Sequence, residues 1–91
     1  MSKTLNLIDP LAKTWVDGST IHLDVRPILL AGGEPFTCIM HALRQLEKED
    51  NLLLHTPFEP KPLLPQLQKM GYLLKSQREG PDHWTVAIEK S

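Results

Sequence analysis

The chain has 91 residues, a formal net charge of -1 and 41% hydrophobic residues, a length and composition typical of one soluble globular domain. This balanced charge gives no electrostatic footprint for nucleic acid or for an anionic membrane. Cys38 is the single cysteine, which excludes an internal disulfide and a thiolate metal site. Apolar runs are far shorter than a membrane span, and the N-terminus lacks the pattern of a secretion signal, so we expect a cytoplasmic protein.

Residues 1–18 form an N-terminal arm that differs from the domain expected over residues 19–91. Asp9 and Pro10 are typical of a helix start, and Gly18 would end a helix of about two turns. The arm has too many apolar side chains for a free tail, so it should cover either a partner or, as we favour, the chain's own sheet. These side chains are Leu5, Leu7, Ile8, Leu11 and Trp15.

The remaining residues predict the order strand, helix, strand, helix, strand, strand. Thr20–Val25 alternates apolar and polar side chains, as a half-buried strand does, and the segment from Pro27 to Gly33 is predicted as a loop. Pro35 fits the first position of a helix that continues to about Glu49. A strand, a proline-rich loop, a second helix and a closing hairpin are expected at residues 51–56, 57–62, 63–70 and 72–90.

This order predicts an α/β two-layer sandwich. Parallel strands joined by right-handed crossovers place both helices on one face of the sheet, and the hairpin adds an antiparallel edge. We therefore expect a mixed four-stranded sheet with one open face. The helices and the sheet should share a core that contains Leu23, Val25, Ile39, Leu43, Leu67, Val86 and Ile88.

The end of the first strand and the start of the first helix predict a recognition site. Arg26 follows the strand, and the backbone N–H groups at the helix start, like its guanidinium, favour an oxyanion. The anion belongs either to a ligand or partner or to the chain itself, with Asp24, Glu34 and Glu59 as internal alternatives. The predicted site comprises Asp24, Arg26, Gly32, Gly33, Glu34, Pro35, Phe36, Phe58 and Glu59.

Three histidines offer a metal-binding alternative on the open face of the sheet. His22, His55 and His83 would lie there together if Leu52 and Leu54 point inward. Clustered imidazoles bind zinc or iron, but no carboxylate accompanies them at a clear ligand spacing. The predicted site therefore contains no metal ligand, and no cofactor is expected.

Several groups of residues resemble the bacterial family named domain of unknown function 2249. The resemblance covers about residues 20 to 90. It rests on Leu23 to Pro27, on Gly33 to Phe36 with Ile39 and Met40, on Pro57 to Pro60 with Pro62 and Leu63, and on Gly71 and Tyr72. That family is related in fold to the TusA and SirA sulfur carriers, so the resemblance implies a TusA-like sandwich. Relatives found beside haemerythrin-like or cupin domains imply a partner or sensor role.

The sulfur carriers have a Cys-Pro pair at the mouth of the first helix. Alignment on Glu34 and Pro35 places Gly32 and Gly33 at those positions, so the resemblance implies that the sulfur-carrying cysteine is absent. Cys38 lies further into the helix, where the dipole favours a thiolate, but no base can be assigned beside it. A structural thiol is the favoured interpretation.

The sequence therefore predicts a small noncatalytic binding or interaction module. Neither a Ser/His/Asp set nor paired carboxylates can be assigned, so no catalytic residue is named. The alternative is a sulfur-transfer or redox accessory protein that uses Cys38. The expected partner is another protein or a small anionic ligand, and neither nucleic acid nor a membrane; a homodimer is a further alternative.

Overall fold

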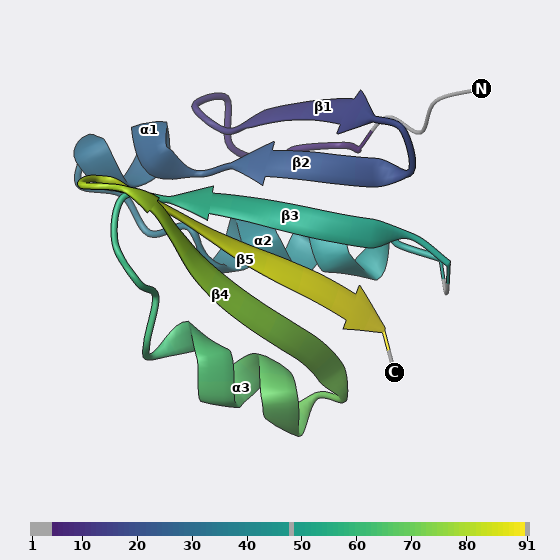
Figure 1. The fold of residues 1–91 in the computed structure, drawn as a ribbon. Coiled ribbons are helices and arrows are strands. Elements are labelled where there is room, and N and C mark those ends of the chain that lie inside the picture. Colours follow the sequence, from purple (N-terminus) through teal and green to yellow (C-terminus); the bar gives the residue numbers. More distant parts are fainter. Residues whose placement is uncertain (1–4, 48, 91) are drawn as a thin grey trace.

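The computed structural model describes residues 5–47 and 49–90 (Figure 1). Over these residues the elements are β1 (Lys13–Asp17), β2 (Thr20–Asp24), α1 (Arg26–Leu30), α2 (Phe36–Arg44), β3 (Asn51–Thr56), α3 (Leu63–Lys69), β4 (Tyr72–Gly80) and β5 (His83–Lys90). The strands form one open sheet in the order β1-β2-β3-β5-β4. β2 and β3 run parallel, and the other neighbouring strands run antiparallel.

The core lies between the sheet and the helices, as the periodicity predicts. β2, β3 and β5 each direct alternate side chains inward, and α2 crosses behind the sheet while α3 lies beside β4 (Figure 1). The predicted core is confirmed, because all its members are at most 1% exposed: Leu23, Val25, Ile39, Leu43, Leu67, Val86 and Ile88. Among the described residues, no helix is both long and apolar enough to span a membrane.

The predicted four-stranded sheet is wrong, because the N-terminal arm adds a fifth strand instead of a helix. β1 pairs along its length with β2, and Gly18 occupies the intervening turn with a φ of 62°. Trp15 and Val16 favour a strand. Pairing with β2 satisfies the backbone hydrogen-bonding groups of this segment, whereas an isolated helix of two turns is not stable in water. The Asp9 side chain still forms a local turn, accepting the N–H of Leu11 at 2.9 Å.

The arm covers the chain's own sheet edge, as favoured from the sequence. Leu5 is buried, whereas Ile8, Leu11 and Trp15 remain exposed. The side chain of Gln45 accepts the N–H of Asn6 and donates to its carbonyl, both at 2.8 Å, which pins the arm to the end of α2. α2 itself ends at Arg44, earlier than predicted. Residues 1–4 of the predicted arm lie outside the described part of the chain.

The predicted loop from Pro27 to Gly33 contains the short helix α1. Pro27 fits the first turn of α1, and the buried side chain of Ile28 anchors it. The N–H of Gly33 donates to the carbonyl of Ile28 at 2.8 Å, and Gly32 has a φ of 82°. A Cβ at Gly33 would lie 3.0 Å from the Ile28 side chain, so the chain turns here in a space that only glycine fits without displacement.

Candidate recognition pocket

Arg26 pairs with Asp24, one of the internal partners predicted for it. Its Nε donates to Oδ1 of Asp24 at 3.0 Å and its Nη2 to Oδ2 at 2.8 Å. The backbone N–H of Arg26 also donates to Oδ1 at 3.0 Å. Burial raises the pKa of Asp24, but the hydrogen bonds and charge of Arg26 outweigh burial and hold this pKa below its usual value. Asp24 and Arg26 therefore clamp the end of β2.

The other two carboxylates proposed as partners of Arg26 have separate roles. Glu34 accepts the N–H of Phe36 and the Thr37 hydroxyl, the latter at 3.3 Å, so it caps α2 from outside. Glu59 lies 3.8 Å from Nζ of Lys61 and accepts a long hydrogen bond from Ser76 at 3.5 Å. Glu34 and Arg26 also line two different hollows of the surface. The anion at the start of α2 is thus supplied by the chain itself.

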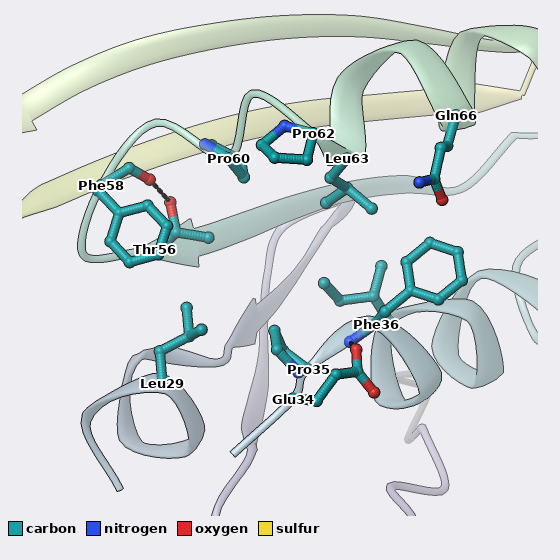
Figure 2. A pocket seen from close by; sticks show the side chains of 11 residues that line it. Leu29, Glu34, Pro35, Phe36, Thr56, Phe58, Pro60, Pro62, Leu63 and Gln66 are labelled. Carbon is teal, nitrogen blue, oxygen red and sulfur yellow. Dashed lines mark hydrogen bonds between the residues drawn. The ribbon is translucent and has the colours of Figure 1, made fainter. Parts of the chain in front are cut away.

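A pocket of about 360 Å³ lies between α1, the start of α2 and the segment that joins β3 to α3 (Figure 2). We call it the proline-walled pocket. Figure 2 shows Pro60 and Pro62 on one wall and Pro35 on the facing side. Its full lining is Leu29, Glu34, Pro35, Phe36, Ile39, Thr56, Phe58, Pro60, Pro62, Leu63 and Gln66.

The pocket is apolar, and three prolines contribute to its walls. Phe58 is 53% exposed and Phe36 is 36% exposed, which is unusual for rings of this size in a folded domain. The hydroxyl of Thr56 donates to the carbonyl of Phe58 at 2.6 Å and fixes the start of the proline-rich loop. Prolines have few backbone conformations, so little conformational entropy remains to be lost when a ligand binds.

The pocket gathers only part of the predicted site. Glu34, Pro35, Phe36 and Phe58 line it, whereas the predicted members that do not are Asp24, Arg26, Gly32, Gly33 and Glu59. Sequence reasoning missed Leu29, because a five-residue helix containing proline is indistinguishable from a loop in a periodicity analysis. It also missed Gln66, for which the sequence holds no signal. Pro60, Pro62 and Leu63 belong to the motif that carried the family resemblance, which was the available signal for them.

Cys38 faces the core and is not among the residues that line the pocket. Cys38 is only 2% exposed, and this burial raises the pKa of its thiol. A raised pKa reduces the thiolate fraction at neutral pH. The surroundings of Cys38 are those of a structural thiol.

The three histidines do come together on the open face, because Leu52 and Leu54 point into the core. Nδ1 of His22 lies 2.9 Å from Nε2 of His55, and Nδ1 of His55 lies 2.8 Å from Nε2 of His83. The three rings lie in a row across β2, β3 and β5, and each ring is hydrogen-bonded to the next through one nitrogen of each. Within residues 5–47 and 49–90, no three His, Cys, Asp or Glu side chains are arranged to hold a metal ion.

The structure is a small α/β domain with an apolar pocket. Residues 22–90 match the family described as uncharacterized conserved protein (DUF2249), and the chain belongs to this family. The match includes every residue that lines the proline-walled pocket. No curated protein and no solved structure matches the chain.

Proposed function

We propose that this protein is a noncatalytic binding module whose recognition site is the proline-walled pocket. The observation that carries the proposal is the exposure of two phenylalanines, Phe36 and Phe58, at a pocket whose walls are already rigid. Folded domains usually bury rings of this size, and exposed apolar surface in a concavity is typical of a binding site. We also propose a TusA-like fold. Apart from the short helix α1, the order over residues 20–90 is strand, helix, strand, helix, hairpin, which supports that relationship.

The partner that fits this pocket best is a protein that inserts an apolar side chain. A volume of about 360 Å³ is near the lower end for small-molecule sites and suits one or two side chains. The charged residue in the lining is Glu34, and Arg26 is committed to Asp24, so a small anionic ligand is disfavoured. Large apolar anchors inserted into pockets provide much of the binding energy at protein interfaces.

Binding is favoured over catalysis because the pocket lacks reactive groups. None of its lining residues is a Cys, His, Lys or Arg. Glu34 already accepts hydrogen bonds at the start of α2, and the Thr56 hydroxyl is engaged by the carbonyl of Phe58. The alternative of sulfur transfer or redox chemistry would require Cys38, which is buried and lies outside this lining.

Nile red, a neutral apolar dye, tests the proposal by fluorescence titration. We expect one saturable site in the wild type and an affinity about tenfold weaker in Phe58→Ser, since removal of half-exposed ring surface gives up roughly 1.4 kcal/mol of apolar burial. Leu73→Ser is the matched control, because Leu73 on β4 is as exposed as Phe58, at 57% against 53%, and is not among the pocket's lining residues. An equal loss in both variants, or no loss in Phe58→Ser, contradicts the proposal.

A further inference from the structure

The row formed by His22, His55 and His83 has properties that a single histidine lacks. His55, at the centre, is only 7% exposed, while its two neighbours are half-buried. The ring centroids of adjacent members lie 5.1 Å apart in both pairs, with interplanar angles of 20° and 28°. Both nitrogens of His55 are therefore engaged, one with each neighbour.

The hydrogen bonds limit how many protons the row can hold. Each nitrogen-to-nitrogen contact shares one proton, because two N–H groups directed at each other repel and two lone pairs form no bond. The two contacts thus use four ring nitrogens and two protons, which leaves two outer nitrogens, Nε2 of His22 and Nδ1 of His83. When all three imidazoles are neutral, the third proton lies on one of these two outer nitrogens. One added proton then occupies the other outer nitrogen. A second added proton must break a hydrogen bond.

Trp15 joins the row to the edge strand β1. Its ring stacks on His22 with a centroid distance of 4.8 Å and an interplanar angle of 11°, and its centroid lies 5.3 Å from that of His55. The Thr14 hydroxyl of the same strand donates to the carbonyl of His22 at 2.8 Å. β1 therefore contacts the row at His22 and His55.

The charged groups around the row come from every neighbouring element. Asp24 on β2 lies opposite His55 in the sheet register and is neutralised by Arg26 of α1, while Lys13 of β1 lies opposite Asp24. Thr85 of β5 lies opposite His55, and its hydroxyl donates at 2.9 Å to Glu79 of β4. Asp24 and Glu79 are thus already engaged with other groups.

We propose that the His22–His55–His83 row is a proton-operated clamp on β1, which stays closed while the row carries at most one added proton and opens when a second one binds. Burial lowers the pKa of His55 to about 4, with further contributions from His22 and His83. A histidine whose pKa is lower in the closed state leaves that state fully stable above about pH 6.5 and favours opening as pH falls from about 6.5 toward 4.

Amide hydrogen exchange of β1, corrected for intrinsic exchange, tests the clamp between about pH 7 and about pH 4.5 with EDTA present. We expect the opening constant of β1 in the wild type to rise at least about tenfold on acidification, since the opened row binds more protons. His55→Phe keeps a ring beneath Trp15 and frees His22 and His83 to bind protons independently. In this variant the rise should fall below about twofold. His41→Gln on α2 is the control and should keep the wild-type rise.

A rise that is absent in the wild type, or that persists in His55→Phe, overturns the proposal. Ring-nitrogen NMR of the wild type provides a measurement that does not depend on how the variant folds. At about pH 5, with β1 still protected, the three imidazoles together should hold no more than one added proton. Two or more added protons on the three imidazoles, while the amides of β1 are still protected from exchange, would contradict the clamp.

Discussion

The pair of Arg26 and Asp24 decides whether the end of β2 is a structural clamp or an anion site, and a double-mutant cycle measures this directly. The variants are Arg26→Gln, Asp24→Asn and the double substitution. Two side-chain hydrogen bonds join the charges, Asp24 is 7% exposed, and one third of the Arg26 side chain is exposed. The burial of this pair is intermediate between that of an exposed ion pair and that of a buried one, so Arg26→Gln should lower the free energy of unfolding by about 2 kcal/mol.

The pH dependence of that loss has a definite sign. The pKa of Asp24 is lower in the folded protein than its ordinary value of 3.8. Its pairing therefore stabilises the fold fully above about pH 3.8, and this stabilisation disappears as pH falls through the folded pKa. The difference in unfolding free energy between wild type and Arg26→Gln should be constant from about pH 5 to about pH 7 and should shrink only under strongly acidic conditions.

Urea unfolding of the four proteins at neutral pH gives the coupling energy, which we expect to be at least about 1 kcal/mol. Lys75→Gln on β4 is the control for loss of a basic side chain, because Lys75 is exposed. A coupling below about 0.3 kcal/mol, or Arg26→Gln that retains full stability but loses about tenfold in Nile red affinity, would refute the assignment of Arg26 to the structural clamp.

Three further predictions follow from packing. Leu43→Ala should lower the unfolding free energy by roughly 2 to 5 kcal/mol, because Leu43 is fully buried, and a loss under about 0.5 kcal/mol contradicts this core. Gly33→Ala should lower the unfolding free energy by about 1 to 3 kcal/mol, since the new Cβ would lie 3.2 Å from the backbone oxygen of Ile28. Gly80→Ala is the control, because a Cβ at Gly80 meets open space, and equal effects of the two substitutions in calorimetry would argue against the contact. Native Cys38 should resist alkylation and gain no persulfide when treated with a cysteine desulfurase, and a stable mass increase of about 32 Da on the folded protein would contradict a structural role.

Periodicity predicted the elements whose two faces meet different surroundings. Residues 20–24 and 83–90 alternate because one face of each strand packs on the helices, and Gly71, with a φ of 94°, ends α3 where predicted. β1 was missed because Asp9 and Pro10 imitate a helix start. The choice between the two structures depends on pairing with β2, a contact that no local pattern encodes.

The site was harder to predict than the fold, because it depends on which of several similar groups meet in space. Asp24, Glu34 and Glu59 are equivalent partners for Arg26 in the sequence, and only the conformation of α1 selects the first. The motif that carried the resemblance does contain Phe36 and Phe58, and the structure places both at one pocket. The sequence did not predict the apolar character of that pocket, because its prolines come from segments that are distant in the chain.

Amide chemical-shift mapping with indole, a neutral mimic of an apolar side chain, tests the central claim most directly. If the proline-walled pocket is the recognition site, the saturable shifts should concentrate at residues 34–39 and 56–66 and should weaken about tenfold in Phe58→Ser. Shifts concentrated instead on the open sheet face around Trp15 and Leu73, with residues 34–39 unchanged, would contradict the account.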